Sequence, residues 1–326
     1  MGGTKKQFVV NMADANAGFF AYIEYVINAI ICGERNKDYV NTPVVNFGKH
    51  TIGIGSKNKI GNNKFYDPNY NENMFFNYFE FKDSVKVEEE THLDYRSPRF
   101  WMVVHDNIGI MCYPHDTGHT ADELKMQDDY DKPYTKKIDD WYKKNRFEAN
   151  RVISQYFEVL PEIQKSLNDE WSELFKPTDK VIGVHVRGTD KQVRIGGRKI
   201  LPEEYYPYID NLLKKGYNKI FLATDDSSFY DIFNSKYPDI VKSLSGILRD
   251  VNGKNIFLDE SVTNNYKKGL DVLKDCLGLA KSNFLLKSAS GVSEFAIYFN
   301  TNLHRNSLNL QYDCRGFLSN KEFPHE

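Results

Sequence analysis

The residues best suited to chemistry in this sequence lie at the end of one apolar run, residues 181–186. They are His185, Arg187, Asp190 and Lys191. A run rich in Val and Ile is typical of a buried parallel strand, and ligands of open α/β sheets bind just beyond the carboxyl ends of the strands. A guanidinium binds phosphate through two parallel hydrogen bonds, and an ammonium binds it as a compact charge. The segment therefore predicts a site for a phosphorylated ligand.

Two later loops have the same character. Their polar or small residues are Thr224, Asp225, Asp226, Ser288, Ser290 and Gly291. A strand predicted over 219–223 precedes the first loop, and a strand predicted over 283–286 precedes the second. Because parallel strands end at the same edge of a sheet, the three loops are expected to form one site. A helix predicted over 292–299 would add free backbone N–H groups and a positive dipole end, which suit a phosphate.

Each of these residues also has a structural interpretation. His185 lies within an apolar strand, which favours a hydrogen-bonded core histidine over a catalyst by about two to one. Arg187 is harder to explain in this way, because a buried guanidinium needs an anion, either a carboxylate or a phosphate. The two aspartates and the two serines of the later loops could equally cap the helices that follow them.

Composition and missing motifs narrow the class of protein. The chain has 43 Lys and Arg against 45 Asp and Glu, a net charge of −2, so nothing directs it as a whole to nucleic acid or an anionic membrane. No apolar run approaches the ~20 residues of a membrane helix, and no signal-peptide core is present. The four cysteines lack CxxC spacing, which predicts free thiols in a reducing cytosol and no zinc site. The Walker, GxGxxG, GxSxG and HExxH motifs are absent, and a metal at residues 115–119 has little support.

The elements that must position these residues alternate between strand and helix. Strands are predicted at 8–12, 44–47, 101–105, 108–112, 181–186, 219–223, 255–258 and 283–286. Helices are predicted at 19–32, within 122–144, at 147–174 with a new start or kink at Pro161, and at 202–214, 229–236, 267–281 and 292–299. Gly33 and Gly216 are expected to end helices, and residues 48–83 are expected to form a loop-rich surface. Alternation of this kind predicts a doubly wound parallel α/β sheet, and the length of 326 residues predicts two domains.

At these same residues the chain resembles the fucosyltransferases that use GDP-fucose. It is most similar to the α-1,6-fucosyltransferases, which include the nodulation-factor enzymes and the animal core enzyme. The likeness lies in residues 183–191, 221–238 and 273–290, and order and spacing agree over residues 147–300. The resemblance implies a GT-B fold, in which two Rossmann-like domains, here 1–175 and 176–326, face each other across a cleft. The C-terminal domain would hold most of the donor.

The resemblance also implies an activity. The chain would be an inverting, metal-independent glycosyltransferase that needs no cofactor and moves L-fucose from GDP-fucose to a hydroxyl of a glycan or glycolipid acceptor. It would be cytoplasmic, either free or held at a membrane through a lipid-linked acceptor. The alternatives are transfer of another GDP-sugar, binding of a GDP-sugar without transfer, and an α/β protein whose polar strand ends are only helix caps.

Roles for single residues follow from the same resemblance. Arg187 would bind the β-phosphate, with Asp190 and Lys191 as further catalytic residues near the leaving phosphate or the acceptor. The remaining donor-binding residues would be His185 and Asp275 at the nucleoside, Ser288 and Ser290 at the pyrophosphate, Asp225 and Asp226 around the pocket, and Gly18 from the N-terminal half.

The chain departs from the family at two positions. Many relatives have a second arginine where this chain has Gly188, so that contact is missing or is supplied by Arg194 or Arg198. The core enzyme has a glutamate, a candidate base, where this chain has Ile195. The general base is therefore open among Asp190, Glu203, Glu204 and Asp14. The aromatic residues Tyr66, Tyr70, Phe75, Phe76, Tyr78 and Phe79 could stack on sugar rings, although core packing is favoured about three to one.

Overall fold

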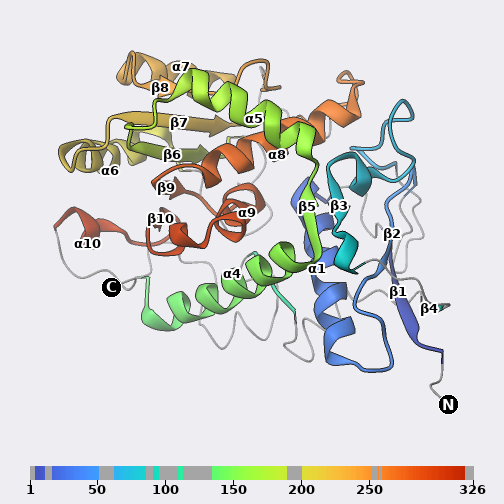
Figure 1. Ribbon diagram of the computed structural model, residues 1–326. Helices are drawn as coiled ribbons and strands as arrows, with labels where there is room; N and C mark the ends of the chain where they lie inside the picture. Colours follow the sequence, from blue (N-terminus) through green and yellow to red (C-terminus); the bar gives the residue numbers. More distant parts are fainter. Residues whose placement is uncertain are drawn as a thin grey trace.

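The computed structural model describes residues 4–11, 17–50, 62–85, 91–94, 109–112, 134–188, 200–250, 256 and 259–319 (Figure 1). The strands are β1 (Lys6–Asn11), β2 (Val44–Asn46), β3 (Phe79–Phe81), β4 (His92–Asp94), β5 (Phe157–Val159), β6 (Val181–Val186), β7 (Lys219–Thr224), β8 (Val241–Lys242), β9 (Phe284–Lys287) and β10 (Ser307–Asn309). The α-helices are α1 (Phe19–Arg35), α4 (Lys136–Tyr156), α5 (Pro161–Leu174), α6 (Pro202–Lys214), α7 (Ser227–Lys236), α8 (Asn265–Ala280), α9 (Gly291–Phe299) and α10 (Arg315–Leu318). Short 3-10 turns are η1 (Met74–Asn77), η2 (Asp83–Val85) and η5 (Thr301–His304).

The C-terminal half is built on a five-stranded parallel sheet in the order β10-β9-β6-β7-β8. In chain order these strands read 5-4-1-2-3, which is the Rossmann arrangement 3-2-1-4-5 written from the other edge. The chain adds β7 and β8 on one side of β6 and then crosses to add β9 and β10 on the other side. The crevice at such a reversal is where ligands of open α/β sheets bind. The reversal here lies between β6 and β9.

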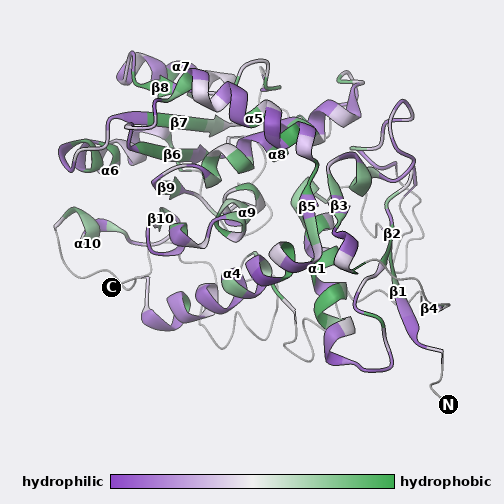
Figure 2. Ribbon diagram, in the orientation of Figure 1, coloured by the Kyte–Doolittle hydropathy of each residue, from purple (hydrophilic) through white to green (hydrophobic). Residues whose placement is uncertain are grey.

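Helices cover both faces of this sheet, as the alternating pattern predicts. On one face, Ile182, Val184 and Leu222 belong to a core cluster that also takes in side chains of α6 and α7. On the other face, an added Cβ at Gly183 would lie 2.7 Å from Ser282 Oγ, so only glycine lets this end of α8 approach β6 closely. The apolar colouring of β6 and β7 in Figure 2 matches strands that are buried on both faces.

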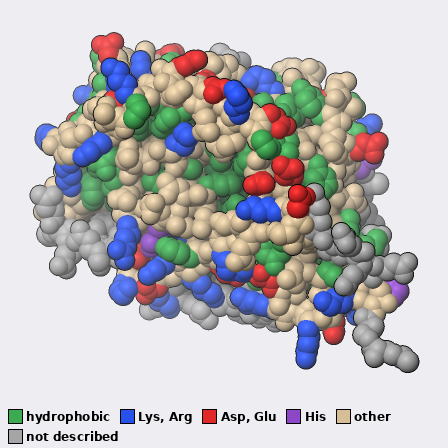
Figure 3. All heavy atoms as spheres, in the orientation of Figure 1, with side chains coloured by type: hydrophobic (Ala, Val, Ile, Leu, Met, Phe, Trp, Pro, Cys, Tyr) green, Lys and Arg blue, Asp and Glu red, His purple; other side chains and the backbone are tan. Residues whose placement is uncertain are grey.

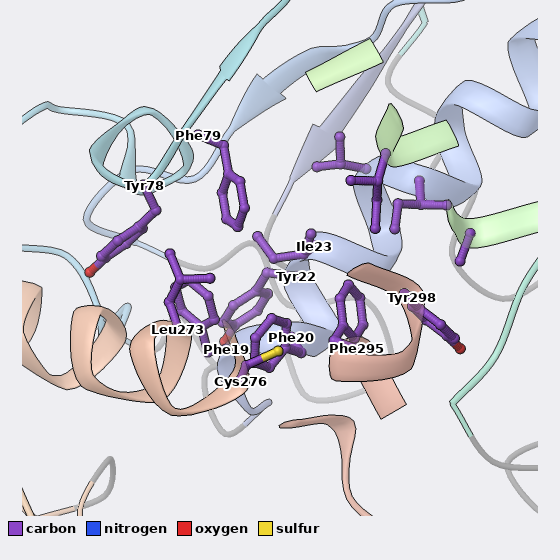
Figure 4. Packing of buried hydrophobic residues seen from close by; sticks show 14 of the residues in the cluster. Phe19, Phe20, Tyr22, Ile23, Tyr78, Phe79, Leu273, Cys276, Phe295 and Tyr298 are labelled. Carbon is purple, nitrogen blue, oxygen red and sulfur yellow. The ribbon is translucent and has the colours of Figure 1, made fainter. Parts of the chain in front are cut away.

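The N-terminal half holds a parallel sheet, β2-β1-β4, and an antiparallel pair, β3 and β5. Its main helix, α1, packs against the C-terminal half rather than standing apart from it. Phe20 of α1 stacks on Phe295 of α9 with ring centroids 4.5 Å apart, and Phe19 packs edge-on against Tyr78 (Figure 4). The largest core cluster draws residues from α1, α4, α8 and α9 together. A boundary at residues 175 and 176 remains a prediction, but any two domains there would share this core.

Two predicted features of the N-terminal half are wrong. Gly33 does not end its helix, since α1 continues to Arg35 and an added Cβ at Gly33 would lie 2.6 Å from the Val40 carbonyl oxygen. Residues 109–112 are not a strand, because the backbone N–H and carbonyl of Ile110 bond to the Asn28 side chain at 2.7 and 3.1 Å. In both cases a tertiary contact accounts for residue types that the local sequence pattern had suggested were a helix end or a strand.

Most of the described part of 48–83 is loop and turn, as expected, but the expectation that it forms a surface is wrong for much of it. Phe65, Phe75, Tyr78 and Phe79 are buried in the main core, which favours the packing interpretation of these aromatic rings. Tyr70 remains exposed and stacks on Tyr266, with ring centroids 3.8 Å apart. The predicted strand at 101–105 and most of the one at 255–258 lie outside the described residues.

Other predictions are confirmed closely. β6 and α6 have the predicted bounds, Pro161 starts α5, and Gly216 follows α6 with a φ of 90° that favours glycine. The four cysteines are free and buried.

Among the described residues, no helix is both long and apolar enough to cross a membrane. Acidic and basic side chains are interspersed over the face drawn in Figure 3, as the small net charge suggests.

Candidate functional site

The carboxyl ends of β6 and β9 bring two predicted site residues together. Arg187 follows β6, and its Nη1 atom lies 3.4 Å from the Oγ of Ser290, which directly precedes α9. This contact spans the point where the strand order reverses. Ser290 is itself fully buried, whereas Arg187 is partly exposed. The geometry therefore suits Ser290 to orienting the guanidinium and Arg187 to meeting an anion.

The loop between β9 and α9 presents an uncapped helix end. Ser290 occupies the N-cap position of α9 but makes no capping hydrogen bond, and Ser288 Oγ has no hydrogen-bond partner in the described part of the chain. The hydroxyl of Ser293 instead lies 3.1 and 3.2 Å from the Ser288 and Ser290 carbonyl oxygens. The capping interpretation of the two serines is thus wrong. The first-turn N–H groups of α9 have no intrahelical acceptor and can receive an anion.

The aspartates after β7 hold the loop after β6. Asp225 Oδ1 accepts a 2.6 Å hydrogen bond from the Gly188 N–H, and Asp226 Oδ1 accepts one of 2.9 Å from Ser228 N as the N-cap of α7. The capping interpretation therefore holds for Asp226. An added Cβ at Gly188 would lie 2.5 Å from the Asp226 Cβ. Position 188 therefore has no room for a side chain while Asp226 keeps this place.

A buried ion cluster lies behind the β9–α9 loop, and sequence reasoning missed it. Glu294 of α9 pairs with Arg146 of α4 through two bonds of 2.6 and 3.1 Å, and with Lys287 of β9 at 2.7 Å. Burial tends to lower the pKa of Arg146, but the Glu294 carboxylate raises it above its ordinary value. Burial raises the pKa of Glu294, and the two cations outweigh it, so that pKa is lowered. The cluster ties both ends of the loop to α4.

Two signals in the sequence could have revealed this cluster. Lys287 ends an apolar strand, and Glu294 lies seven residues later on a helix whose other buried residues are mostly apolar. Buried charges are almost always paired, so each needed a partner. Arg146 could not be assigned as that partner, because it is 148 residues from Glu294 in the sequence.

Asp275 lies on the face of α8 that packs against β6. Leu279 approaches Gly183 on that face, and four residues of helix and two of strand both span about 6 Å. Asp275 therefore lies at the height of His185, one step nearer the carboxyl edge. Burial raises the pKa of Asp275 to about 7, and the positive charge of Arg249 opposes this rise. His185 and Asp275 are each more than nine-tenths buried.

Gly18 occupies the N-cap of α1, and that helix end also lacks a side-chain cap. An added Cβ there would meet no atom within 4 Å, so packing does not require glycine at this position. The stacking of Phe20 on Phe295 places the first turn of α1 beside α9 (Figure 4). This arrangement agrees with a place for Gly18 on the donor side, which remains a prediction.

Several predicted site residues lie outside the described part of the chain. They are Asp190, Lys191, Arg194, Ile195, Arg198 and Asp14. Of the two candidate bases that the structure does place, Glu203 is exposed, whereas Glu204 Oε1 accepts a 2.9 Å bond from Leu201 N at the start of α6. Among the described residues, no group of three or more His, Cys, Asp or Glu side chains could hold a metal ion. His115 and His119 lie outside that range.

Comparison with known proteins gave structural matches only. No family model and no curated protein matches the chain. The solved structures similar to it include NodZ α-1,6-fucosyltransferase soaked with GDP-fucose, at 16% identity and a TM-score of 0.47, covering 90% of this chain and 93% of that one. Fucosyltransferase NodZ from Bradyrhizobium has the same identity and TM-score and covers 91% and 93%.

Proposed function

We propose that this chain is a GT-B glycosyltransferase that moves L-fucose from GDP-fucose to a hydroxyl group of a glycan or glycolipid, with inversion and without a metal. The observation that carries the proposal is the Arg187–Ser290 contact across the strand-order reversal, beside the uncapped end of α9. A partly exposed guanidinium and a row of free N–H groups at that point match a pyrophosphate. The choice of GDP-fucose rests on the motif resemblance.

The chemistry fits these groups. As fucose leaves GDP, negative charge grows on the β-phosphate and positive character grows at the anomeric carbon. Fixed donors aimed at the leaving group stabilise that charge without reorganising, a role for Arg187 and the α9 N–H groups. The buried cluster around Glu294 would keep the α9 end in place as this charge develops. An acceptor hydroxyl would attack the opposite face of the sugar, and a carboxylate would take its proton.

The general base remains unassigned, but the contacts of the described residues distinguish two of its candidates. Glu204 is already engaged with the backbone of Leu201, whereas Glu203 is exposed at the first turn of α6, a helix that begins at the carboxyl edge of the sheet. We therefore favour Glu203 among the described residues, and Asp190 and Asp14 stay candidates outside them. Glu203→Gln would lower the rate of transfer without changing GDP affinity if this side chain is the base.

Calorimetric titration with GDP, alongside UDP and ADP, tests the nucleotide site. We expect selective binding of GDP without added metal, and a 10- to 100-fold loss of affinity in Arg187→Ala, as expected for about 1.5–3 kcal/mol from a hydrogen bond to a charged group. Arg305→Ala, which removes an exposed arginine after η5, is the matched control. Equal GDP binding by Arg187→Ala and the wild type would contradict the proposal.

A GDP-sugar-binding protein without transferase activity is the second candidate. Gly188 and Ile195, in place of a family arginine and glutamate, favour it. Incubation with GDP-fucose and a panel of acceptors, followed by measurement of released GDP, distinguishes the two. GDP release that needs an acceptor supports transfer. Tight binding with no release supports the second candidate.

A further inference from the structure

Arg249 is a partly buried arginine that no motif singled out. Its Nε and Nη2 atoms are buried and make no hydrogen bond within the part of the chain that the structure describes. These two nitrogens form the side-on fork with which guanidinium groups bind paired acceptors. Leaving such donors buried and unsatisfied costs about 1–3 kcal/mol each. A native chain keeps such a fork most readily where an occupant satisfies it.

Neighbouring contacts fix the position of Arg249 at the carboxyl edge of the sheet. Leu248 N donates to Asp271 of α8 at 2.9 Å, and Asp250 N donates to the Asp225 carbonyl after β7 at 2.8 Å. The guanidinium carbon lies 5.0 Å from the centre of the Tyr230 ring on α7, within the range of a cation–π contact. Arg249 therefore lies between β7 and α8, on the other side of β6 from the β9–α9 loop.

An unsatisfied acceptor lies near this unsatisfied donor. Asp275 Oδ1 is buried and makes no hydrogen bond in the described part of the chain. Asp271 and Asp225 bond to the backbone on either side of Arg249, at Leu248 and Asp250. The charges of Arg249, Asp271, Asp225 and Glu170 all act on the Asp275 carboxyl group. Acidic surroundings of this kind would repel a phosphate and suit an uncharged ligand that presents N–H donors beside a pair of acceptors.

We infer that Arg249 reads the base of the bound nucleotide, with its fork directed at the O6 and N7 acceptors of guanine. Guanine offers those two acceptors beside the N1–H and N2–H donors, and the arginine fork is their commonest protein partner. Asp275 would accept from the N–H edge. This inference rests on the proposed function, and it divides the site between Arg187 for the phosphates and Arg249 for the base. Arg249 would then supply a second guanidinium to the nucleotide site, although position 188 holds Gly rather than Arg.

Binding of 7-deaza-GDP, which lacks the N7 acceptor, tests this contact without an activity assay. The wild type should bind it about 10-fold or more weakly than GDP, for the loss of one bond to a charged donor. In Arg249→Met, which keeps an apolar stem over Tyr230, GDP affinity should fall and the GDP to 7-deaza-GDP ratio should approach one. Arg249→Lys should behave in the same way, because an ammonium cannot form the fork. Arg305→Met is the control.

The outcomes separate this inference from the proposed function. Inosine diphosphate lacks the N2 amine, so the ratio of GDP to inosine diphosphate affinity should stay at its wild-type value in Arg249→Met, which a general structural disturbance would not preserve. A wild-type preference for GDP over 7-deaza-GDP that persists in Arg249→Met overturns the inference and leaves the proposed function standing. So does loss of GDP affinity without any loss of guanosine affinity, since the contact would then be to phosphate. Failure of the wild type to bind guanine nucleotides overturns both.

Discussion

The two sides of the sheet's carboxyl edge differ in whether their buried charged groups have hydrogen-bond partners. On the β9–α9 side, Arg146, Lys287 and Glu294 are almost wholly buried and each is paired. On the β7–α8 side, atoms of Arg249 and Asp275 are equally buried but make no hydrogen bonds within the described residues. Paired charges stabilise one arrangement of the chain, and unpaired ones raise its free energy until a ligand binds. The difference separates the framework of the site from its recognition surface.

The largest effect should come from breaking the paired side. Glu294→Ala would leave two buried cations without their common counter-ion, and removal of one partner from a buried pair typically costs about 3–5 kcal/mol. We expect the free energy of unfolding in urea to fall by that amount. Glu173→Ala, which removes an exposed glutamate of α5, should change it by less than about 0.5 kcal/mol. A loss below 1 kcal/mol in Glu294→Ala would show that the cluster adds little.

Removing a charge from the unpaired side should instead raise the free energy of unfolding. The folded pKa of Asp275 is about 7 against an ordinary 3.8, so the folded state retains a proton that the unfolded state has lost between those values. Stability from this group is full below pH 4 and is lost as the pH rises to about 7, at roughly 1.4 kcal/mol per pH unit. Asp275→Asn should therefore be a few kcal/mol more stable than the wild type at pH 8 and nearly equal to it at pH 4.

Urea unfolding at the two pH values measures this difference, with the exposed Asp140→Asn as a control that should change little at either pH. The same Asp275→Asn substitution should weaken GDP binding, because the amide no longer offers a carboxylate to the N–H edge of the base. A variant that is more stable at pH 8 and binds GDP more weakly would show that the buried acid serves binding at the expense of the fold. Equal stability at pH 8 would place Asp275 in a solvated setting.

The strands, the helices and the strand-end loops could be predicted from the sequence far better than the buried charges on either side of the sheet's edge. β6, α6 and the three strand-end loops were predicted because apolar periodicity and turn residues act locally. Arg146, Lys287 and Glu294 pair across distant parts of the chain, and Arg249 follows a short strand, β8, that carries almost no periodic signal. The resemblance implied a role for Asp275, whereas Arg249 could be recognised only from the packing, which leaves its Nε and Nη2 atoms without hydrogen bonds in the described part of the chain.

A smaller loss of stability is expected from crowding at Gly188, which lies between the two sides. Gly188→Ala places a methyl group against the Asp226 Cβ, and overpacking of this kind costs about 1–3 kcal/mol. In an Asp226→Gly background the same substitution should cost less than half as much, because the opposing Cβ is gone. Urea unfolding of the two single variants and the double variant gives the coupling. Additive losses would mean that Asp226 does not exclude a side chain at position 188.

The smallest expected change in stability concerns Gly18. Its N-cap position has open space around an added Cβ, so Gly18→Ala should cost no more than about 1 kcal/mol, the loss of a tolerated N-cap residue. Gly316→Ala is a matched control, since an added Cβ there also meets no atom within 4 Å. If the end of α1 lies against the donor, the methyl group at position 18 should weaken GDP-fucose binding several-fold while the control does not. Equal binding by both variants would confine donor recognition to the C-terminal half.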